Sequence, residues 1–247
     1  MSRQRVLAVF CVFMLFMCAA LERHVYVKQA SSTNTAKTKT DEKIAYLTFD
    51  DGPSVNTEKV IAILEKEHVP ATFFLIGEQI TEDKKDLLCT MVEKGHLLGV
   101  HTYCHKSEQI YRSADAYIED ALKTADKIQE VTGKKTTVYR FPWGSCNGYL
   151  TNICDTIVEE MRKRGYEYYD WNVSAEDSVG SPTSSSIMRN IEKDFKKYNE
   201  PVILMHDSGA NTVTVDTLPA IIKRLKEEGY QFATLDKRTE VCHYRRN

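Results

Sequence analysis

The chain has almost no net charge and no internal repeat. Its 33 Lys and Arg residues nearly balance 35 Asp and Glu residues, leaving a formal net charge of −2 at pH 7. Because no cationic excess is present to attract a phosphate backbone, nucleic acid is not an expected partner. With 42% hydrophobic residues and only seven cysteines among 247 residues, the chain is neither disordered nor a disulfide miniprotein. One large core is expected.

Long apolar runs are also missing, apart from one near the N-terminus. Arg3 and Arg5 precede an uncharged stretch at residues 6–21, which is the pattern of an export signal. As a helix, this stretch would reach about 24 Å, short of the ~30 Å hydrocarbon core of a bilayer. The sequence predicts a signal peptide or N-terminal membrane anchor at residues 1–24 and a flexible linker at residues 25–42. The protein is therefore expected to be exported, to the extracellular space or the cell surface.

Short β-type runs alternate with helical patterns from residue 43 onward, which favours an α/β domain with a mainly parallel sheet. Gly133 and Gly229 each follow a helical pattern and precede a strand, a position typical of a helix C-cap. Seven strands are expected, at residues 44–49, 71–76, 97–100, 137–141, 166–171, 202–205 and 231–235.

Chemically reactive side chains follow several of these strands. Loops at the carboxyl ends of parallel strands converge, so residues there can form one site. His101 and His105 could present both imidazoles to a metal ion, with one carboxylate as third ligand and an open position for water. Asp50 and Asp51 should point to opposite sides of a strand and so perform different tasks. His206 could donate a proton from the opposite side of the substrate.

Five ordered motifs resemble those of the polysaccharide deacetylases of carbohydrate esterase family 4. They are Thr48–Pro53, His101–His105, Arg140–Gly144, Asp170–Asn172 and Leu204–Asp207. The resemblance implies a distorted (β/α) barrel of about seven parallel strands, with a catalytic domain at residues 43–240. It also implies metal-dependent hydrolysis of N-acetyl groups on the N-acetylglucosamine units of a polysaccharide, which releases acetate.

The same resemblance assigns the individual site residues. Asp51, His101 and His105 would bind a divalent metal ion, with zinc favoured. Asp50 would be the general base that takes a proton from water, and Arg140 would hold Asp50 in place. His206 would protonate the departing amine with Asp170 as its supporting carboxylate, while Trp143, Trp171 and Leu204 would contact the substrate.

Several alternatives stay open at this point. Two histidines and a carboxylate also describe the facial triad of non-haem iron oxygenases, although that class is expected to have an antiparallel β-fold. A non-catalytic glycan-binding module is the second rival. Peptidoglycan is the favoured substrate, and chitin oligomers or another surface glycan are the alternatives. Cys104 and Cys146 could form a disulfide, remain inert thiols, or, in the case of Cys104, add a ligand to the metal.

Overall fold

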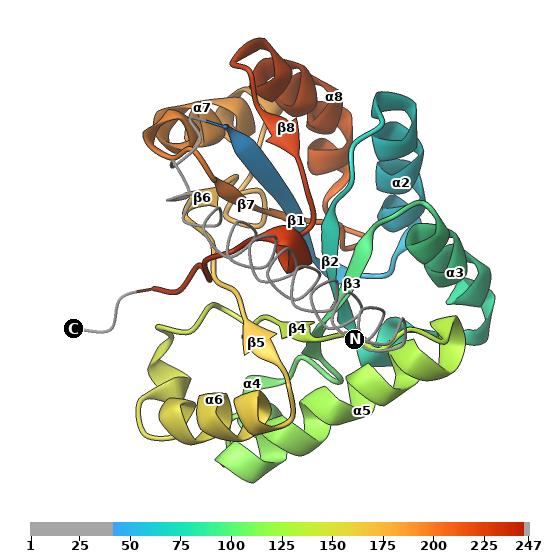
Figure 1. Ribbon diagram of the computed structural model, residues 1–247, viewed down its shortest axis with the longest axis vertical. Coiled ribbons are helices and arrows are strands. Elements are labelled where there is room, and N and C mark those ends of the chain that lie inside the picture. The colour runs from blue at the N-terminus through green and yellow to red at the C-terminus, as the bar shows by residue number, and fades with distance from the viewer. Residues whose placement is uncertain (1–41, 245–247) are drawn as a thin grey trace, which may run out of the picture. The chain divides into compact units, whose positions relative to one another are not determined.

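A computed structural model of the protein describes residues 42–244. The predictions for residues 1–24 and for most of the linker therefore lie outside the described residues. The described part alternates strands and helices (Figure 1). Its strands are β1 (Ile44–Gly52), β2 (Thr72–Ile76), β3 (Leu97–Thr102), β4 (Val138–Tyr139), β5 (Glu167–Tyr168), β6 (Val173–Ser174), β7 (Val202–His206) and β8 (Gln231–Phe232).

Helices follow most of the strands and surround the sheet (Figure 1). The α-helices are α2 (Val55–Glu67), α3 (Lys85–Glu93), α4 (Ser107–Ile110), α5 (Ala114–Thr132), α6 (Cys154–Lys163), α7 (Ser184–Asp194) and α8 (Thr212–Glu227). Within residues 42–244 there are also five short 3-10 helices: η1 (Gly77–Gln79), η2 (Glu82–Lys84), η3 (Gly148–Leu150), η4 (Phe195–Lys197) and η5 (Leu235–Lys237). Gly133 caps α5 with a φ of 69°, as the sequence pattern predicts.

All strand pairs of the sheet are parallel, in the order β5-β4-β3-β2-β1-β7-β6, with β8 paired to β1 off this path. The predicted distorted barrel is confirmed: the parallel strands curl into a half-barrel with flanking helices. Because the sheet is parallel, it does not fit the antiparallel fold expected of the iron oxygenase alternative.

Alternate residues of each strand pack on opposite sides of the sheet, as the pleat requires. On β1, Leu47 and Phe49 belong to the larger cluster that the helices cover, whereas Tyr46 belongs to a smaller inner cluster with Phe74 and Val138. A second, smaller set of apolar side chains therefore packs on the inner side of the curled sheet. The polar residues of this inner side lie at the carboxyl ends of the strands.

The predicted strand at residues 166–171 is wrong in one respect. The structure has two short strands in this region, β5 and β6, which pair with β4 and β7 at opposite ends of the sheet order. The connecting residues hydrogen-bond to both sides: Tyr169 N donates to Tyr139 O over 3.0 Å, and Asn172 N donates to Val202 O over 3.2 Å. The residues between β5 and β6 therefore connect the two edges of the half-barrel. One continuous strand would keep the same neighbours along its length and could not make this connection.

The described residues after 240, the predicted end of the domain, also contact the rest of the fold. Asp170 N donates a hydrogen bond to Cys242 O over 2.7 Å, and the His243 ring stacks on Tyr168 with centroids 3.6 Å apart. The last described residues therefore pack along the β5–β6 connection.

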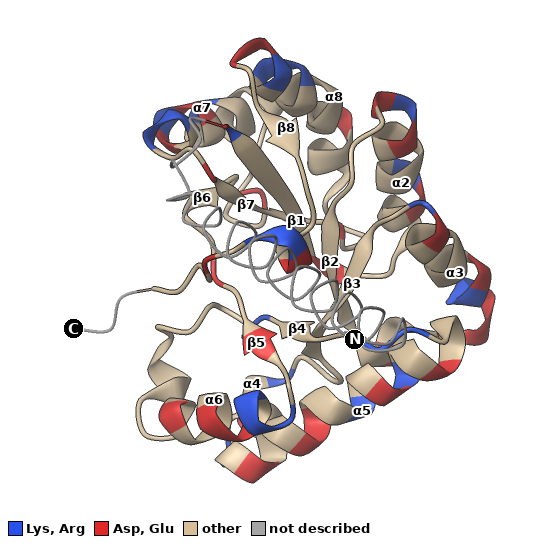
Figure 2. Ribbon diagram, in the orientation of Figure 1, with Lys and Arg blue, Asp and Glu red and all other residues tan. Residues whose placement is uncertain are grey.

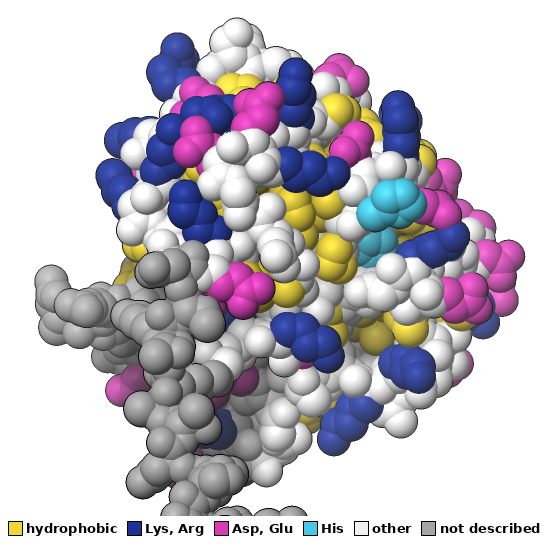
Figure 3. All heavy atoms as spheres, turned by 45° about the horizontal axis from the view of Figure 1, so that its top comes forward, with side chains coloured by type: hydrophobic (Ala, Val, Ile, Leu, Met, Phe, Trp, Pro, Cys, Tyr) yellow, Lys and Arg dark blue, Asp and Glu magenta, His cyan; other side chains and the backbone are white. Residues whose placement is uncertain are grey.

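Charged residues lie mainly on the outer helices, where both signs are interspersed (Figure 2). The face shown in Figure 3 likewise mixes Lys and Arg with Asp and Glu. Among residues 42–244, no helix is both long and apolar enough to cross a membrane.

Candidate active site

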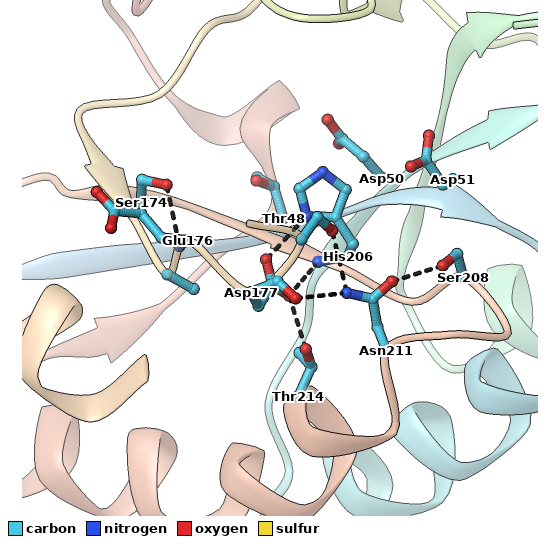
Figure 4. A network of polar contacts seen from close by, with 12 residues as sticks. Thr48, Asp50, Asp51, Ser174, Glu176, Asp177, His206, Ser208, Asn211 and Thr214 are labelled. Atoms are coloured by element: carbon cyan, nitrogen blue, oxygen red, sulfur yellow. Dashed lines mark hydrogen bonds and ion pairs between the residues drawn. The ribbon is translucent and has the colours of Figure 1, made fainter. Parts of the chain in front are cut away.

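The end of β1 departs from regular strand geometry at Asp51. Asp51 has a φ of 73°, and the pairing of β1 with β2 shifts register between Asp50 and Gly52. A bulge of this kind redirects a side chain. The expectation that the two adjacent carboxylates point to opposite sides is therefore wrong, and both lie near the His206 ring (Figure 4). Gly52 is needed beside them, because a Cβ there would lie 2.6 Å from Asp207 Oδ2.

Asp51, His101 and His105 are brought together as the sequence predicts. Their potential ligand atoms all lie within 4.8 Å of one another. Asp51 Oδ1 lies 3.4 Å from Nε2 of each histidine. His101 comes from the end of β3 and is buried, while His105 lies beyond that strand with a φ of 52°.

The donor set fits a divalent cation. His101 Nδ1 lies 2.9 Å from Arg140 O. Because a carbonyl can only accept, Nδ1 donates this hydrogen bond, and Nε2, which faces Asp51, is the nitrogen available to a metal ion. Burial lowers the pKa of His105, which favours its neutral form. Asp51 Oδ1 is buried without a hydrogen-bond partner. Three electron-pair donors thus converge, and a cation among them would remove their mutual repulsion.

Asp50 is held by a buried ion pair with Arg140. Arg140 Nη1 donates to Asp50 Oδ1 over 2.9 Å, and the arginine side chain is fully buried. The guanidinium also donates to Thr48 Oγ1 and to the backbone oxygens of Tyr169 and Asp170. This network satisfies the buried charge and fixes the carboxylate beside the metal-ligand cluster.

His206 ends β7 opposite Asp50 in the strand register, and its partner is Asp177. His206 Nδ1 lies 2.8 Å from Asp177 Oδ1, and the His206 backbone N–H donates to Asp177 Oδ2 over 2.8 Å. Thr214 Oγ1 donates to the same Oδ2, and Asn211 Nδ2 donates to Asp177 O (Figure 4). Burial alone would lower the pKa of His206, but the hydrogen bond and charge of Asp177 raise it to about 9.

The assignment of Asp170 as the partner of His206 is contradicted. The buried Asp170 carboxylate instead accepts hydrogen bonds from Ser145 N, Ser145 Oγ and Tyr244 N, over 2.9, 2.6 and 2.8 Å. Asp170 follows β5, whereas His206 ends β7, and β4, β3, β2 and β1 separate these strands in the sheet order. Asp170 joins the loop after β4 to the C-terminal segment.

We expect Asp170→Asn to destabilise the fold rather than to change proton transfer. An asparagine side chain keeps one acceptor oxygen for three donors, so at least one buried donor loses its partner, at a cost of about 2 kcal/mol. Denaturant unfolding measures this loss, and Ser145→Ala, which deletes one of the donors, should give a smaller one. If Asp170→Asn instead shifted the alkaline limb of the pH–rate profile, Asp170 would be the carboxylate that supports His206.

The three predicted substrate residues have different surroundings. Trp143 is 51% exposed, and its ring centroid lies 4.9 Å from that of His105. Leu204 is buried on β7 beside Thr48. Trp171 is partly buried between Arg140 and Tyr244, with its ring 5.6 Å from the guanidinium carbon of Arg140.

Cys104 and Cys146 are both free thiols, so the proposed disulfide between them is not present. Cys104 also lies outside the group of potential metal ligands. Its backbone N–H donates to Asp120, as does that of Tyr103. Asp120 thus supports the segment between the two histidine ligands, a role that sequence reasoning missed because the residue lies in the middle of α5.

Comparison with known proteins agrees with this geometry. Residues 37–169 match the family model for polysaccharide deacetylase. A peptidoglycan-N-acetylglucosamine deacetylase of Bacillus cereus is 32% identical over 197 residues, which cover 78% of this chain and 69% of that protein.

Two crystal structures share the fold. The catalytic domain of a peptidoglycan N-acetylglucosamine deacetylase from Eubacterium rectale is similar with a TM-score of 0.77 and 32% identity, covering 83% of this chain and 94% of that one. A polysaccharide deacetylase from Bacillus cereus has a TM-score of 0.72 and 29% identity, over 81% of this chain and 97% of that one. The chain therefore belongs to the polysaccharide deacetylase family, carbohydrate esterase family 4, and is a hydrolase of non-peptide carbon–nitrogen bonds.

Proposed function

We propose that the protein removes N-acetyl groups from N-acetylglucosamine units of peptidoglycan in a metal-dependent reaction. The observation that carries this proposal is the convergence of Asp51, His101 and His105 beside the Asp50–Arg140 ion pair. These three residues would hold the divalent ion, with zinc favoured because imidazole and carboxylate ligands suit it. A bound ion would lower the pKa of a coordinated water and polarise the acetyl carbonyl.

The two remaining ionisable groups supply proton transfer. Asp50 accepts a proton from the attacking water, and Arg140 keeps its carboxylate oriented for that step. His206, held in its charged form by Asp177, donates a proton to the amine as the carbon–nitrogen bond breaks. The backbone N–H of Trp143 is proposed to stabilise the oxyanion of the tetrahedral intermediate. Leu204 is proposed to contact the acetyl methyl group, and Trp171 a sugar ring.

Peptidoglycan is proposed as the polymer because relatives similar over most of the chain are named for that substrate. An export signal or membrane tether at residues 6–21 would place the catalytic unit outside the cell, where that polymer lies. Chitin oligomers and other surface glycans share the N-acetylglucosamine unit and remain the alternative substrates.

Metal removal should abolish acetate release. We expect the full-length protein to release acetate from peptidoglycan, to lose activity on chelation, and to regain it when zinc is restored. Acetate is measured for peptidoglycan and for chitin oligomers in parallel, so that the preferred polymer identifies the substrate. Glycan binding is measured on the same samples.

Two results would contradict the proposal. Acetate release that persists after complete removal of the metal would exclude a metal-dependent mechanism. Glycan binding without acetate release, in protein with metal bound, would favour the non-catalytic binding module instead.

A further inference from the structure

A pair of exposed aromatic rings lies beside the metal-ligand cluster. Trp143 and Tyr149 are 51% and 58% exposed, and their ring centroids lie 5.8 Å apart. On its other side Trp143 contacts the His105 ring at 4.9 Å. The two rings therefore extend outward from a metal ligand, in the order His105, Trp143, Tyr149. Tyr149 belongs to η3 and lies outside the five sequence motifs.

Tyr149 is supported from behind by two further tyrosines. Its ring stacks on that of Tyr111, with centroids 5.8 Å apart and an interplanar angle of 12°. Tyr111 stacks in turn on Tyr117, at 5.7 Å and 2°. Tyr117 is fully buried and Tyr111 is 8% exposed, so exposure rises along the column toward Tyr149. Tyr111 thus covers one face of the Tyr149 ring, and the rest of the Tyr149 side chain remains accessible to solvent.

The loop that carries both exposed rings is held by hydrogen bonds between its own residues and by one from Tyr111. Asn147 Nδ2 donates to Pro142 O and Gly144 O over 3.0 and 2.7 Å. Tyr149 N donates to Asn147 Oδ1 over 2.9 Å, and Tyr111 Oη donates to Pro142 O over 3.0 Å. The rings are thus positioned before any ligand binds, which reduces the entropy lost on binding.

We propose that Tyr149, together with Trp143, binds the sugar ring adjacent to the unit that is deacetylated, and so makes the enzyme prefer a polymer over a single sugar. This inference rests on the proposed N-deacetylase function. A pyranose ring has an apolar face of C–H groups and a polar edge, which suits an exposed aromatic ring. Continuity with His105 favours this occupant, because a glycan held at the catalytic groups must continue to one side of the reacting unit.

The test compares acetate release from an N-acetylglucosamine pentamer and from the monosaccharide. We expect Tyr149→Ala to lower the ratio of kcat/KM for the pentamer to that for the monosaccharide by about tenfold. Tyr149→Phe keeps the ring and should retain the native ratio. Tyr198→Ala is compared with it, because Tyr198 is another exposed aromatic residue and lines the hollow of Trp171 and Tyr244, the second place where a sugar ring could bind.

If Tyr149→Ala kept the native ratio of the two kcat/KM values, the proposal would be overturned. If Tyr198→Ala lowered that ratio instead, polymer binding would be assigned to the hollow at Trp171.

A binding measurement separates failure of this proposal from failure of the proposed function. Trp143 and Trp171 are the two tryptophans of the chain, so pentamer binding can be followed by tryptophan fluorescence without turnover. If Tyr149→Ala weakened pentamer binding and Tyr149→Phe did not, the role of the Tyr149 ring in sugar binding would be supported even if no acetate were released. Equal binding by native protein and Tyr149→Ala would reject it.

Discussion

Asp50→Asn should lower kcat by about 10²–10⁴-fold while leaving the metal bound. An asparagine can still accept the hydrogen bond from Arg140, but it cannot take a proton from water at neutral pH. The metal ligands Asp51, His101 and His105 are unchanged in this variant. Acetate release and a zinc titration measure the two properties separately.

Asp51→Asn is the matched control for this prediction. It makes the same chemical change at the next residue, where the carboxylate faces the two histidines rather than Arg140. We expect Asp51→Asn to weaken zinc binding, because a neutral amide is a poorer ligand than a carboxylate. If Asp50→Asn lost zinc and Asp51→Asn retained it, the roles of the two carboxylates would have to be exchanged. Near-native turnover in Asp50→Asn would remove Asp50 as the base.

The strands that carry these groups could be predicted because their local patterns agree with their final burial. The run from Ile44 to Phe49 is almost entirely buried in β1, and the apolar run before His206 is buried in β7. Continuous apolar runs of this length, alternating with helices, are typical of parallel sheets covered on both faces. The polar residues that follow such strands then gather at one end of the sheet.

The partner of His206 could not be chosen without the strand order. Asp170 and Asp177 both follow short β-type runs, but only β6, which precedes Asp177, pairs with β7. One signal was present in the sequence: the apolar residues Val173 and Ala175 alternate with polar ones, and the same period reaches Asp177. The structure buries all three. An acidic residue at the end of a period-two buried pattern indicates an internal contact, yet the pattern does not identify the residue that it meets.

The geometry at Asp51 was equally hidden, because regular alternation predicts that neighbouring side chains diverge. Asp51 instead has a left-handed conformation, and the register of β1 with β2 shifts beside it. Such irregular backbone is typical of functional sites. Residue types were thus enough to suggest the metal ligands, while their convergence depends on a backbone conformation that a local pattern does not encode.

Asp177→Asn should shift the alkaline limb of the pH–rate profile to lower pH. In the native protein Asp177 helps to raise the pKa of His206 to about 9, so the histidine remains protonated and able to act as an acid up to that range. Without the carboxylate, burial would favour the neutral ring, and the pKa should fall to its ordinary value of about 6.5 or below. At pH 8 the protonated fraction, and with it kcat, should then fall by at least about tenfold.

The same contact should make stability depend on pH in a defined direction. The folded-state pKa of His206 lies above its unfolded value, so the contact with Asp177 stabilises the fold fully below about pH 6.5. This contribution is lost as the pH rises through about 9. The free energy of unfolding should therefore be higher for native protein than for Asp177→Asn, and this difference should decrease toward alkaline pH. Denaturant unfolding at several pH values measures it. Thr214→Val removes a hydrogen bond to Asp177 but keeps the carboxylate that faces His206, so as a matched control it should not shift the alkaline limb to lower pH. An unchanged alkaline limb in Asp177→Asn would show that His206 is not the group that protonates the amine.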